Sequence, residues 1–321
     1  MERYWSKITD CERRATGRKL CVMANQNSGT LLVTGASGHL GRRVLELLLA
    51  DPRNAGRKLV ALTRTPDKLS EFAAKGVELR AASFDDGASL ANAFRGAERA
   101  LIISTDALDR PGRRLEQHQN AVQAAKASGV EHLVYTSLTH CEPSSLVALA
   151  PDHWGTESIL RESEVPYTVL RNNMYTDYLL MGLPYAVKSG KLVNSYGAGK
   201  VSYVTREDCA RAAALALSGS FRGRAVLDVT GPKAISQAEL AAIVSEIVGK
   251  AIQYVAVDAA TAVANNVGAG LPTPIAELLV SFERSASAGQ LAVESSSVQD
   301  LTGSAPSSVH AFLSGQRAAL G

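Results

Sequence analysis

The segment LLVTGASGHLG, residues 31–41, joins a strand-like run to a helix-like one. LLVT has the aliphatic character of a buried strand, and an amphipathic segment of helical period begins at His39. The three glycines between or just after them, Gly35, Gly38 and Gly41, have the spacing GxxGxxG. At such a junction they permit a tight turn, close approach of a pyrophosphate, and close packing of helix on strand. This segment therefore predicts a dinucleotide site in which phosphate meets the N-terminus of a helix.

The residues after the second predicted strand distinguish the two nicotinamide cofactors. An acidic residue at this position binds the ribose of NAD, whereas an arginine accommodates the 2′-phosphate of NADP. Arg64 ends the strand, and no acid lies between Leu59 and Pro66. We therefore expect NADPH, with the alternative that Arg64 is an ordinary solvated residue. The residues assigned to the phosphates are Gly35, Ser37, Gly38, His39, Leu40, Gly41 and Arg64.

Strand-like and helix-like segments alternate through the first half of the chain, which predicts a parallel sheet covered on both faces. Right-handed crossovers make it a Rossmann-type doubly wound α/β fold. We expect one domain over residues 29–321, with a smaller C-terminal α/β lobe from about 172–200 and 230–321, and a flexible extension over residues 1–28. The predicted strands are 31–35, 58–64, 77–83, 99–105, 131–137, 165–172 and 252–257. The predicted helices are 39–50, 66–76, 87–96, 111–129, 151–163, 208–219 and 240–249, with one short helix after Ser285.

Further cofactor contacts are expected where later strands end, because ligands of such sheets bind beyond the carboxyl ends of the strands. Asp85 either accepts a hydrogen bond from adenine or caps the next helix. The residues assigned to this trough are Phe84, Asp85, Ile103, Ser104, Thr105, Tyr135, Thr136 and Ser137.

The overall composition excludes several classes of protein. Hydrophobic residues make up 46% and charged residues 20%, which is typical of a globular chain. The 34 basic and 31 acidic side chains nearly balance, so no charge pattern favours nucleic acid. No run approaches the length of a membrane helix, and four scattered cysteines show no disulfide framework. We expect a cytoplasmic protein with reduced thiols, no membrane or nucleic-acid partner and no metal site.

The catalytic chemistry is not that of the common short-chain dehydrogenases, which use a helical Tyr-x-x-x-Lys. The single match, Tyr196 to Lys200, contains two glycines, so we interpret it as a loop and a chance match. The helix after the fifth strand carries His153 and Glu157 four residues apart instead. The histidine could donate a proton, with the carboxylate raising its pKa. The alternative is an ordinary pair on a helix surface.

Several motifs together resemble the NmrA-like branch of the atypical short-chain dehydrogenases, and most of all its bacterial NADPH-dependent quinone reductases and triphenylmethane reductases. The similarity extends from about Leu31 to the end of the chain. It is carried by TGASGHLG (34–41), LTRTPDK (62–68), ISTDAL (103–108), AAKASGVEHLVYTSL (124–138), DHWGTE (152–157), YTVLRNNMYTDYL (167–179) and SYVTREDCA (202–210).

This resemblance implies direct hydride transfer from NADPH to a flat, electron-poor acceptor such as a quinone, without flavin. It implies that Asn172 and Tyr175 face the nicotinamide and acceptor, and that His153 holds a position where relatives also have histidine. Trp154 in the helix after the fifth strand, and Asn173 and Met174, depart from the quinone reductases, which leaves the acceptor open.

Flat and soft side chains suited to an aromatic ring are Trp154, Met174, Tyr175 and Tyr178, which alternatively pack between sheet and lobe. Two other functions remain open: an NmrA-type redox sensor that binds dinucleotide without turnover, and a reductase of a dye or enone. A homodimer is one assembly compatible with these expectations.

Overall fold

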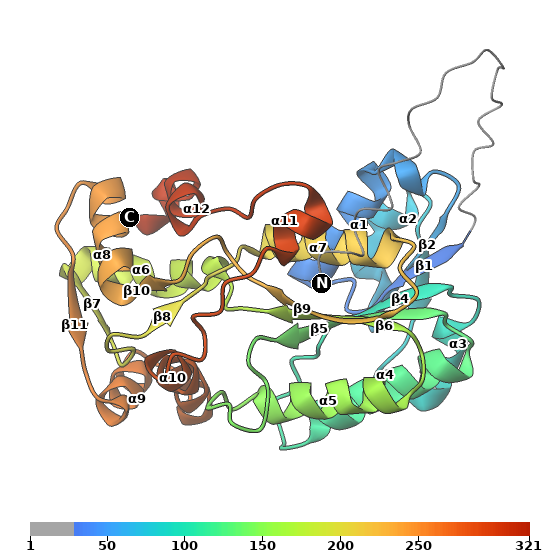
Figure 1. The fold of residues 1–321 in the computed structure, drawn as a ribbon, viewed down its shortest axis with the longest axis horizontal. Coiled ribbons are helices and arrows are strands. Elements are labelled where there is room, and N and C mark those ends of the chain that lie inside the picture. Colours follow the sequence, from blue (N-terminus) through green and yellow to red (C-terminus); the bar gives the residue numbers. More distant parts are fainter. Residues whose placement is uncertain (1–28) are drawn as a thin grey trace, which may run out of the picture.

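A seven-stranded parallel sheet forms the centre of the computed structural model, which describes residues 29–321 (Figure 1). The strand order is β3-β2-β1-β4-β5-β6-β9. The chain starts in the middle of the sheet, adds strands on one side, and then crosses to add the others. This is the predicted doubly wound order, and the prediction for residues 1–28 lies outside the described residues. The strands are β1 (Thr30–Val33), β2 (Lys58–Thr63), β3 (Glu78–Ala81), β4 (Arg99–Ile102), β5 (His132–Leu138), β6 (Tyr167–Asn172) and β9 (Arg224–Val229).

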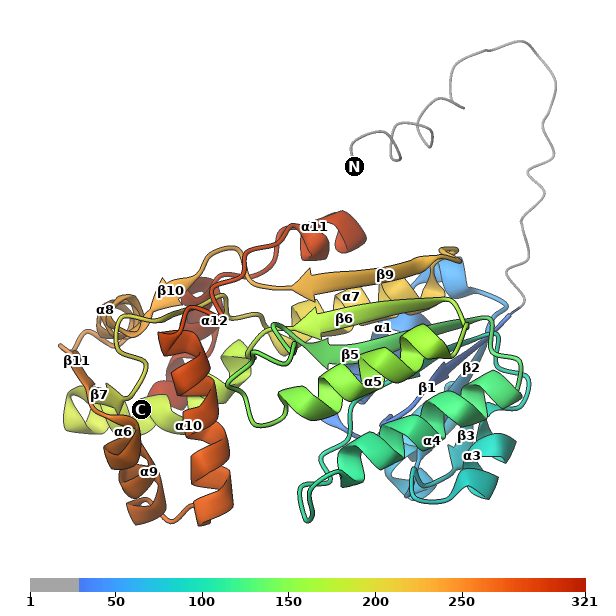
Figure 2. The same ribbon diagram turned by 60° about the horizontal axis from the view of Figure 1, so that its bottom comes forward.

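Helices cover both faces of this sheet (Figures 1 and 2). One apolar core joins the sheet to α1 and α7, and a second joins it to α3, α4 and α5. The predicted helix 66–76 is shorter than expected: a 3₁₀ turn, Pro66–Leu69, leads into α2 (Ser70–Ala73). The other helices of this part are α1 (His39–Ala50), α3 (Gly87–Phe94), α4 (Arg113–Ala127), α5 (Ala150–Glu162) and α7 (Arg206–Ser218), with a 3₁₀ turn at Pro52–Asn54.

Elements after β6 build the smaller lobe at the carboxyl end of the sheet (Figure 1). Strand β7 pairs in parallel with β11, and β8 pairs antiparallel with β10. The lobe has its own apolar core, which includes Leu183, Val201 and Leu240. Its elements are α6 (Leu179–Ser189), β7 (Lys191–Asn194), β8 (Lys200–Val201), β10 (Ile235–Ser236), α8 (Gln237–Val248), β11 (Gln253–Ala256), α9 (Ala259–Gly268), α10 (Thr273–Ser287), α12 (Val309–Gly315) and 3₁₀ turns at Thr176–Tyr178 and Arg317–Leu320.

Much of the second half was not predicted, because the predicted elements do not include helices α6, α9 and α10 or strands β7, β8, β9 and β10. Strand β9 is the edge strand of the main sheet, and α6 contains Pro184 yet remains helical. The tail holds two short helices rather than one, and the first, α11 (Ser297–Thr302), returns to the main domain, where Val298 joins the core beside α7. In the part of the chain that the structure describes, no helix is long and apolar enough to cross a membrane.

Candidate functional site

The glycine turn between β1 and α1 has the geometry that a phosphate requires. Gly35 has a φ of +58°, where side chains are disfavoured. A Cβ on Gly41 would lie 2.4 Å from the carbonyl oxygen of Gly35 and 2.8 Å from Cα of Ala36, so only glycine fits there. No side chain caps α1, and its first turn carries no acid. The first N–H groups of the helix, from His39 onward, are therefore available to an anion.

Arg64 lies beside this turn because the end of β2 is bonded to it. Thr63 Oγ1 donates to Ser37 Oγ at 2.9 Å, and the Ala36 N–H donates to the Leu62 carbonyl at 3.2 Å. Arg64 itself is exposed, and within residues 29–321 it forms no ion pair. Its guanidinium is therefore free to meet a 2′-phosphate on a ribose bound at the turn.

Arg42 is a residue of this region that the sequence analysis did not assign. Its Nε donates to the Ser37 carbonyl at 3.3 Å, and its Nη atoms bond to Glu71 and to the Lys68 carbonyl. It therefore braces the glycine turn against the segment after β2. Its place directly after Gly41 shows that Arg42 lies near the turn. The sequence does not show where its guanidinium points, because that depends on how α1 packs against the segment after β2.

The part of the sheet edge after β3, where we expect the adenine of the cofactor, contains an ion pair. Asp85 pairs with Arg113 at 2.8 Å and accepts from Gln117 Nε2 at 2.9 Å, and these bonds lower its pKa to about 2. The alternative that Asp85 caps α3 is wrong: Asp86 does so, accepting from the N–H groups of Ala88 and its neighbour. Adenine binding by Asp85 stays a prediction.

Phe84 lies beside this pair and is buried. Its carbonyl accepts a hydrogen bond from Asn120 Nδ2 at 2.9 Å, which fixes the chain after β3 to α4. Its place at the edge where adenine is expected is compatible with the prediction and does not test it.

The loop after β4 lies against the glycine turn. Ile103 Cβ is 3.4 Å from the position that a Cβ on Gly35 would occupy. The N–H of Ile103 donates to Thr34 Oγ1 at 3.0 Å, and the N–H of Ser104 donates to Thr136 Oγ1 at 2.9 Å. The glycine turn after β1 and the predicted trough residues Ile103, Ser104 and Thr136 are thus brought together at one edge of the sheet.

Two of the predicted trough residues turn away from this edge. Tyr135 is fully buried, and its hydroxyl meets His153 Nδ1 at 2.9 Å between the sheet and α5. The prediction that Tyr135 lines the trough is therefore wrong for its side chain. Ser137 donates its hydroxyl to Glu157 Oε1 at 2.6 Å, so that group too is directed to α5.

The expected pair of His153 with Glu157 does not form. Glu157 is buried and accepts two bonds from Arg171 of β6, at 2.9 and 2.8 Å. His153 faces Arg114 Nη2 at 3.3 Å instead. Burial and the Arg114 charge hold the pKa of His153 well below its ordinary value. The prediction that Glu157 raises this pKa is wrong, because the face of α5 that carries both residues is buried against the sheet.

Asn172 and Tyr175 meet where β6 ends. Asn172 Nδ2 donates to the Tyr175 hydroxyl at 3.1 Å, and burial raises the pKa of that hydroxyl above its ordinary value. Asn172 Oδ1 is buried and has no hydrogen-bond partner among the described residues. Tyr175 stacks on Tyr178, with ring centroids 5.6 Å apart, and Arg206 lies against both rings.

The other two side chains expected to form an acceptor wall lie elsewhere. Trp154 packs under Arg161, whose guanidinium carbon is 4.6 Å from the ring centroid. Met174 belongs to the core of the lobe, near the hydroxyl of Tyr196. The Tyr196 to Lys200 segment is a turn between β7 and β8, which confirms that it is no helical Tyr-x-x-x-Lys.

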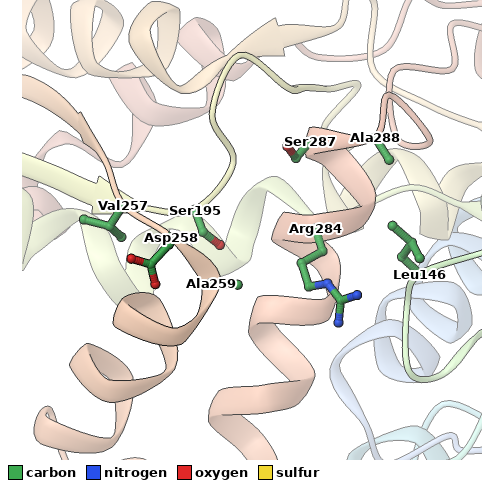
Figure 3. Close-up of a pocket in the computed structure, with 8 residues that line it drawn as sticks. All are labelled: Leu146, Ser195, Val257, Asp258, Ala259, Arg284, Ser287 and Ala288. Atoms are coloured by element: carbon green, nitrogen blue, oxygen red, sulfur yellow. The ribbon is translucent and has the colours of Figure 1, made fainter.

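A cavity of about 400 Å³ opens elsewhere, between α10, the start of α9 and the loop after β5 (Figure 3). Arg284 and Asp258 are its charged side chains, and none of the predicted site residues lines it. The lining residues are Leu146, Ser195, Val257, Asp258, Ala259, Arg284, Ser287 and Ala288.

The residues at the edge of the sheet fit NADPH. The turn offers free N–H groups and a cradle that a Cβ on Gly41 would fill. Farther along the edge, Thr105 Oγ1 and Asn172 Oδ1 are buried polar atoms for which the described residues supply no partner. A dinucleotide bound across the switch point of the sheet would have its phosphates at the turn.

Comparison with known proteins supports this assignment. A model of the NmrA-like family matches residues 27–312. Quinone oxidoreductase 2 of Escherichia coli (strain K12) is 36% identical over 273 residues, which are 85% of this chain and 93% of that protein.

Two solved structures have closely similar folds. The E. coli NADPH-dependent quinone oxidoreductase complexed with NADPH has a TM-score of 0.84 at 34% identity, covering 89% of this chain and 99% of that one. The Citrobacter sp. triphenylmethane reductase complexed with NADP(H) has a TM-score of 0.83, also at 34% identity and with the same coverage. The family model and the identity over most of both chains confirm the resemblance: this chain belongs to the NmrA-like family.

Proposed function

We propose that this chain is an NADPH-dependent oxidoreductase that reduces a quinone or a similar planar, electron-poor acceptor by direct hydride transfer, without flavin. NADPH, when bound, supplies a hydride, and with one proton from water a quinone becomes a hydroquinone. The observation that carries the proposal is the Asn172–Tyr175 pair at the carboxyl end of β6, on the same edge as the glycine turn. The similarity to a quinone oxidoreductase and a dye reductase supports it.

The glycine turn and Arg64 bind the cofactor in this proposal. The N–H groups at the start of α1 hold the pyrophosphate, and the Arg64 guanidinium pairs with the 2′-phosphate. Asn172 Oδ1, which lacks a partner among the described residues, accepts from an amide N–H at the nicotinamide end. These contacts fix the geometry of the donor, and positioning of the two reactants supplies much of the rate.

Tyr175 acts on the acceptor. Its hydroxyl oxygen accepts from Asn172, which leaves its own hydrogen directed elsewhere, and no described residue accepts it. Since burial raises the pKa of Tyr175, the hydroxyl stays protonated at neutral pH. It therefore donates a hydrogen bond to the acceptor oxygen on which negative charge develops. Stacked Tyr178 extends the flat surface beside it.

The absence of a helical tyrosine–lysine pair is compatible with this reaction. A ketone needs a strong proton donor because its product alkoxide is a poor anion. A quinone gives an aryloxide, which is comparatively stable, so a neutral hydrogen-bond donor suffices. His153 is not needed as an acid, and its buried position between Tyr135 and Arg114 does not suit that role.

The proposal is tested by following the loss of NADPH absorbance with purified protein. The panel contains 1,4-benzoquinone, 1,4-naphthoquinone and a triphenylmethane dye, each with NADPH and with NADH. We expect turnover with quinones and a preference for NADPH. NADPH binding without turnover of any acceptor would contradict the proposal and favour a redox sensor.

The role of Tyr175 is tested by Tyr175→Phe, which removes the hydroxyl and keeps the ring. We expect kcat to fall about 10- to 100-fold, since one donor to a developing oxyanion is lost, while the Kd of NADPH stays unchanged. Tyr185→Phe is the matched control, because that side chain is 73% exposed on α6. Equal activity of the two variants would exclude Tyr175 as the donor.

A further inference from the structure

We propose that Arg114 and His118 of α4 are positioning residues that hold Thr105 so that its hydroxyl binds the nicotinamide half of NADPH. The inference rests on the proposed function for the identity of the ligand. It concerns two buried side chains beneath the loop after β4, Arg114 and His118, to which neither the sequence motifs nor the proposed mechanism assigns a role.

Both backbone groups of Thr105 are bound by side chains of α4. Its N–H donates to His118 Nε2 at 3.0 Å, and its carbonyl accepts from Arg114 Nε at 2.8 Å. Thr105 Oγ1, by contrast, is buried and has no hydrogen-bond partner among the described residues. A buried hydroxyl without a partner is costly. A ligand at the edge of the sheet would remove this cost, because Thr105 lies just past the end of β4.

The bonds of His118 determine its tautomer. A backbone N–H can only donate, so His118 Nε2 must accept and carries no proton. The hydrogen is therefore on Nδ1, which donates to Thr156 Oγ1 at 2.9 Å, and that hydroxyl donates to the Asp152 carbonyl at 2.6 Å. His118 is fully buried, and burial together with the Arg114 charge lowers its pKa to about 3. The ring is thus a fixed neutral acceptor throughout the neutral range.

The same reasoning applies to the residues that hold Arg114. A guanidinium only donates, so His153 Nε2 accepts from Arg114 Nη2 at 3.3 Å, and His153 Nδ1–H donates to the Tyr135 hydroxyl at 2.9 Å. Asp152 Oδ2 lies 3.4 Å from Arg114 Nη1. His153 therefore holds Arg114 through Nε2, and Arg114 in turn holds Thr105. The Nδ1–H bond to Tyr135 fixes the orientation of the His153 ring.

A merely structural role predicts a different result from a positioning role. Any buried histidine stabilises the fold, and its loss lowers the melting temperature. His132 is the matched control: it is fully buried and its Nε2 bonds to Thr168 Oγ1 at 2.9 Å, but it lies at the amino end of β5, away from the site. Only a positioning role makes cofactor affinity depend on His118 and not on His132.

The experiment measures the Kd of NADPH by fluorescence titration without any acceptor, for the wild-type protein, His118→Leu, His118→Gln and His132→Leu. We expect His118→Leu to raise the Kd about tenfold, the effect of one displaced hydrogen-bonding group. His118→Gln, whose Oε1 can accept from Thr105, should restore most of the affinity. His132→Leu should leave the Kd within about twofold while lowering the melting temperature comparably.

Equal Kd values for His118→Leu and His132→Leu would overturn the inference and leave the proposed function intact. Failure of the wild-type protein to bind NADPH would overturn the proposed function and, with it, the inference. If His118→Leu does not fold, the Kd of Thr105→Val for NADPH tests the inference instead. This variant keeps the two backbone hydrogen bonds of residue 105 and replaces only the hydroxyl with a methyl group. It should weaken NADPH binding about tenfold, and an unchanged Kd would overturn the inference.

Discussion

Gly41→Ala tests the cofactor cradle most directly. The added Cβ would lie 2.4 Å from the Gly35 oxygen and 2.8 Å from Cα of Ala36, and both atoms belong to the backbone of the turn. An ordinary contact begins near 3.4 Å, so the turn must move by about 1 Å relative to the helix. Overpacking of this kind costs about 1–3 kcal/mol. We expect the free energy of unfolding to decrease by an amount near the upper end of that range, because the contacts are with backbone atoms and no flexible side chain can move aside.

The effect on binding should be comparable in free energy to the effect on stability. Moving the turn breaks charge-assisted hydrogen bonds to the pyrophosphate, and a loss of about 3 kcal/mol from such bonds raises a dissociation constant about 100-fold. We therefore expect the Kd of NADPH for Gly41→Ala to rise about 100-fold by fluorescence titration, with urea unfolding measured in parallel.

Two further glycine variants give a graded control. Gly38→Ala brings a Cβ to 3.3 Å from one oxygen, that of Gly35, and should have an intermediate effect. Gly87→Ala, at the start of α3, places its Cβ in open space and should be neutral or stabilising by up to about 1 kcal/mol. If Gly41→Ala binds NADPH within threefold of wild type, the assignment of this turn to the pyrophosphate is refuted.

Three other substitutions have defined outcomes. Arg64→Ala should raise the KM for NADPH about tenfold or more and leave that for NADH within about twofold; equal effects in the kinetic assay would show that Arg64 does not bind the 2′-phosphate. Arg99 is fully buried and donates to the carbonyls of Ala216 and Leu217 at the end of α7 and of Phe221 just beyond it. Arg99→Leu should therefore lower the free energy of unfolding in urea by about 2–4 kcal/mol, and a loss below about 1 kcal/mol would contradict this helix-capping role. The pKa of Asp85 is lowered from 3.8 to about 2. Its contribution to stability is therefore fully present above pH 3.8 and is lost as the pH falls through about 2. Asp85→Asn should lack this part of the pH dependence of the melting temperature, and a profile identical to that of the wild type would show that Asp85 makes no such contribution.

Local chemistry made the first half of the fold, and a few helix ends of the second half, predictable. The glycine turn, the alternation of strands and helices, and helix ends such as Gly129 and Gly249 depend on residues close together in the chain, and both of those glycines have the positive φ that their role requires. The capping box of Ser236 and Glu239, which begins α8, is likewise formed by residues close together in the chain. Even the one error at a cap, Asp85 for Asp86, is a shift of one residue.

The second half depended on distant partners. Strand β7 finds its partner β11 about sixty residues later, and β9 adds to β6 only because the main sheet has an open edge there. Helix α6 tolerates Pro184 while Leu183 and Ala186 are buried in the core of the lobe. Burial against a distant surface outweighs the local signals in such segments.

The sequence by itself determined the glycine turn that we propose as the cofactor cradle, because such a turn depends only on glycines at a fixed spacing between one strand and one helix. Only the tertiary structure decided the partners of the buried polar residues. Glu157 lies one helical turn from His153, yet it pairs with Arg171, while His153 meets Arg114. A buried charge or ring nitrogen bonds to whatever group the packing of helix on sheet places beside it, and spacing along one helix does not specify which group that is.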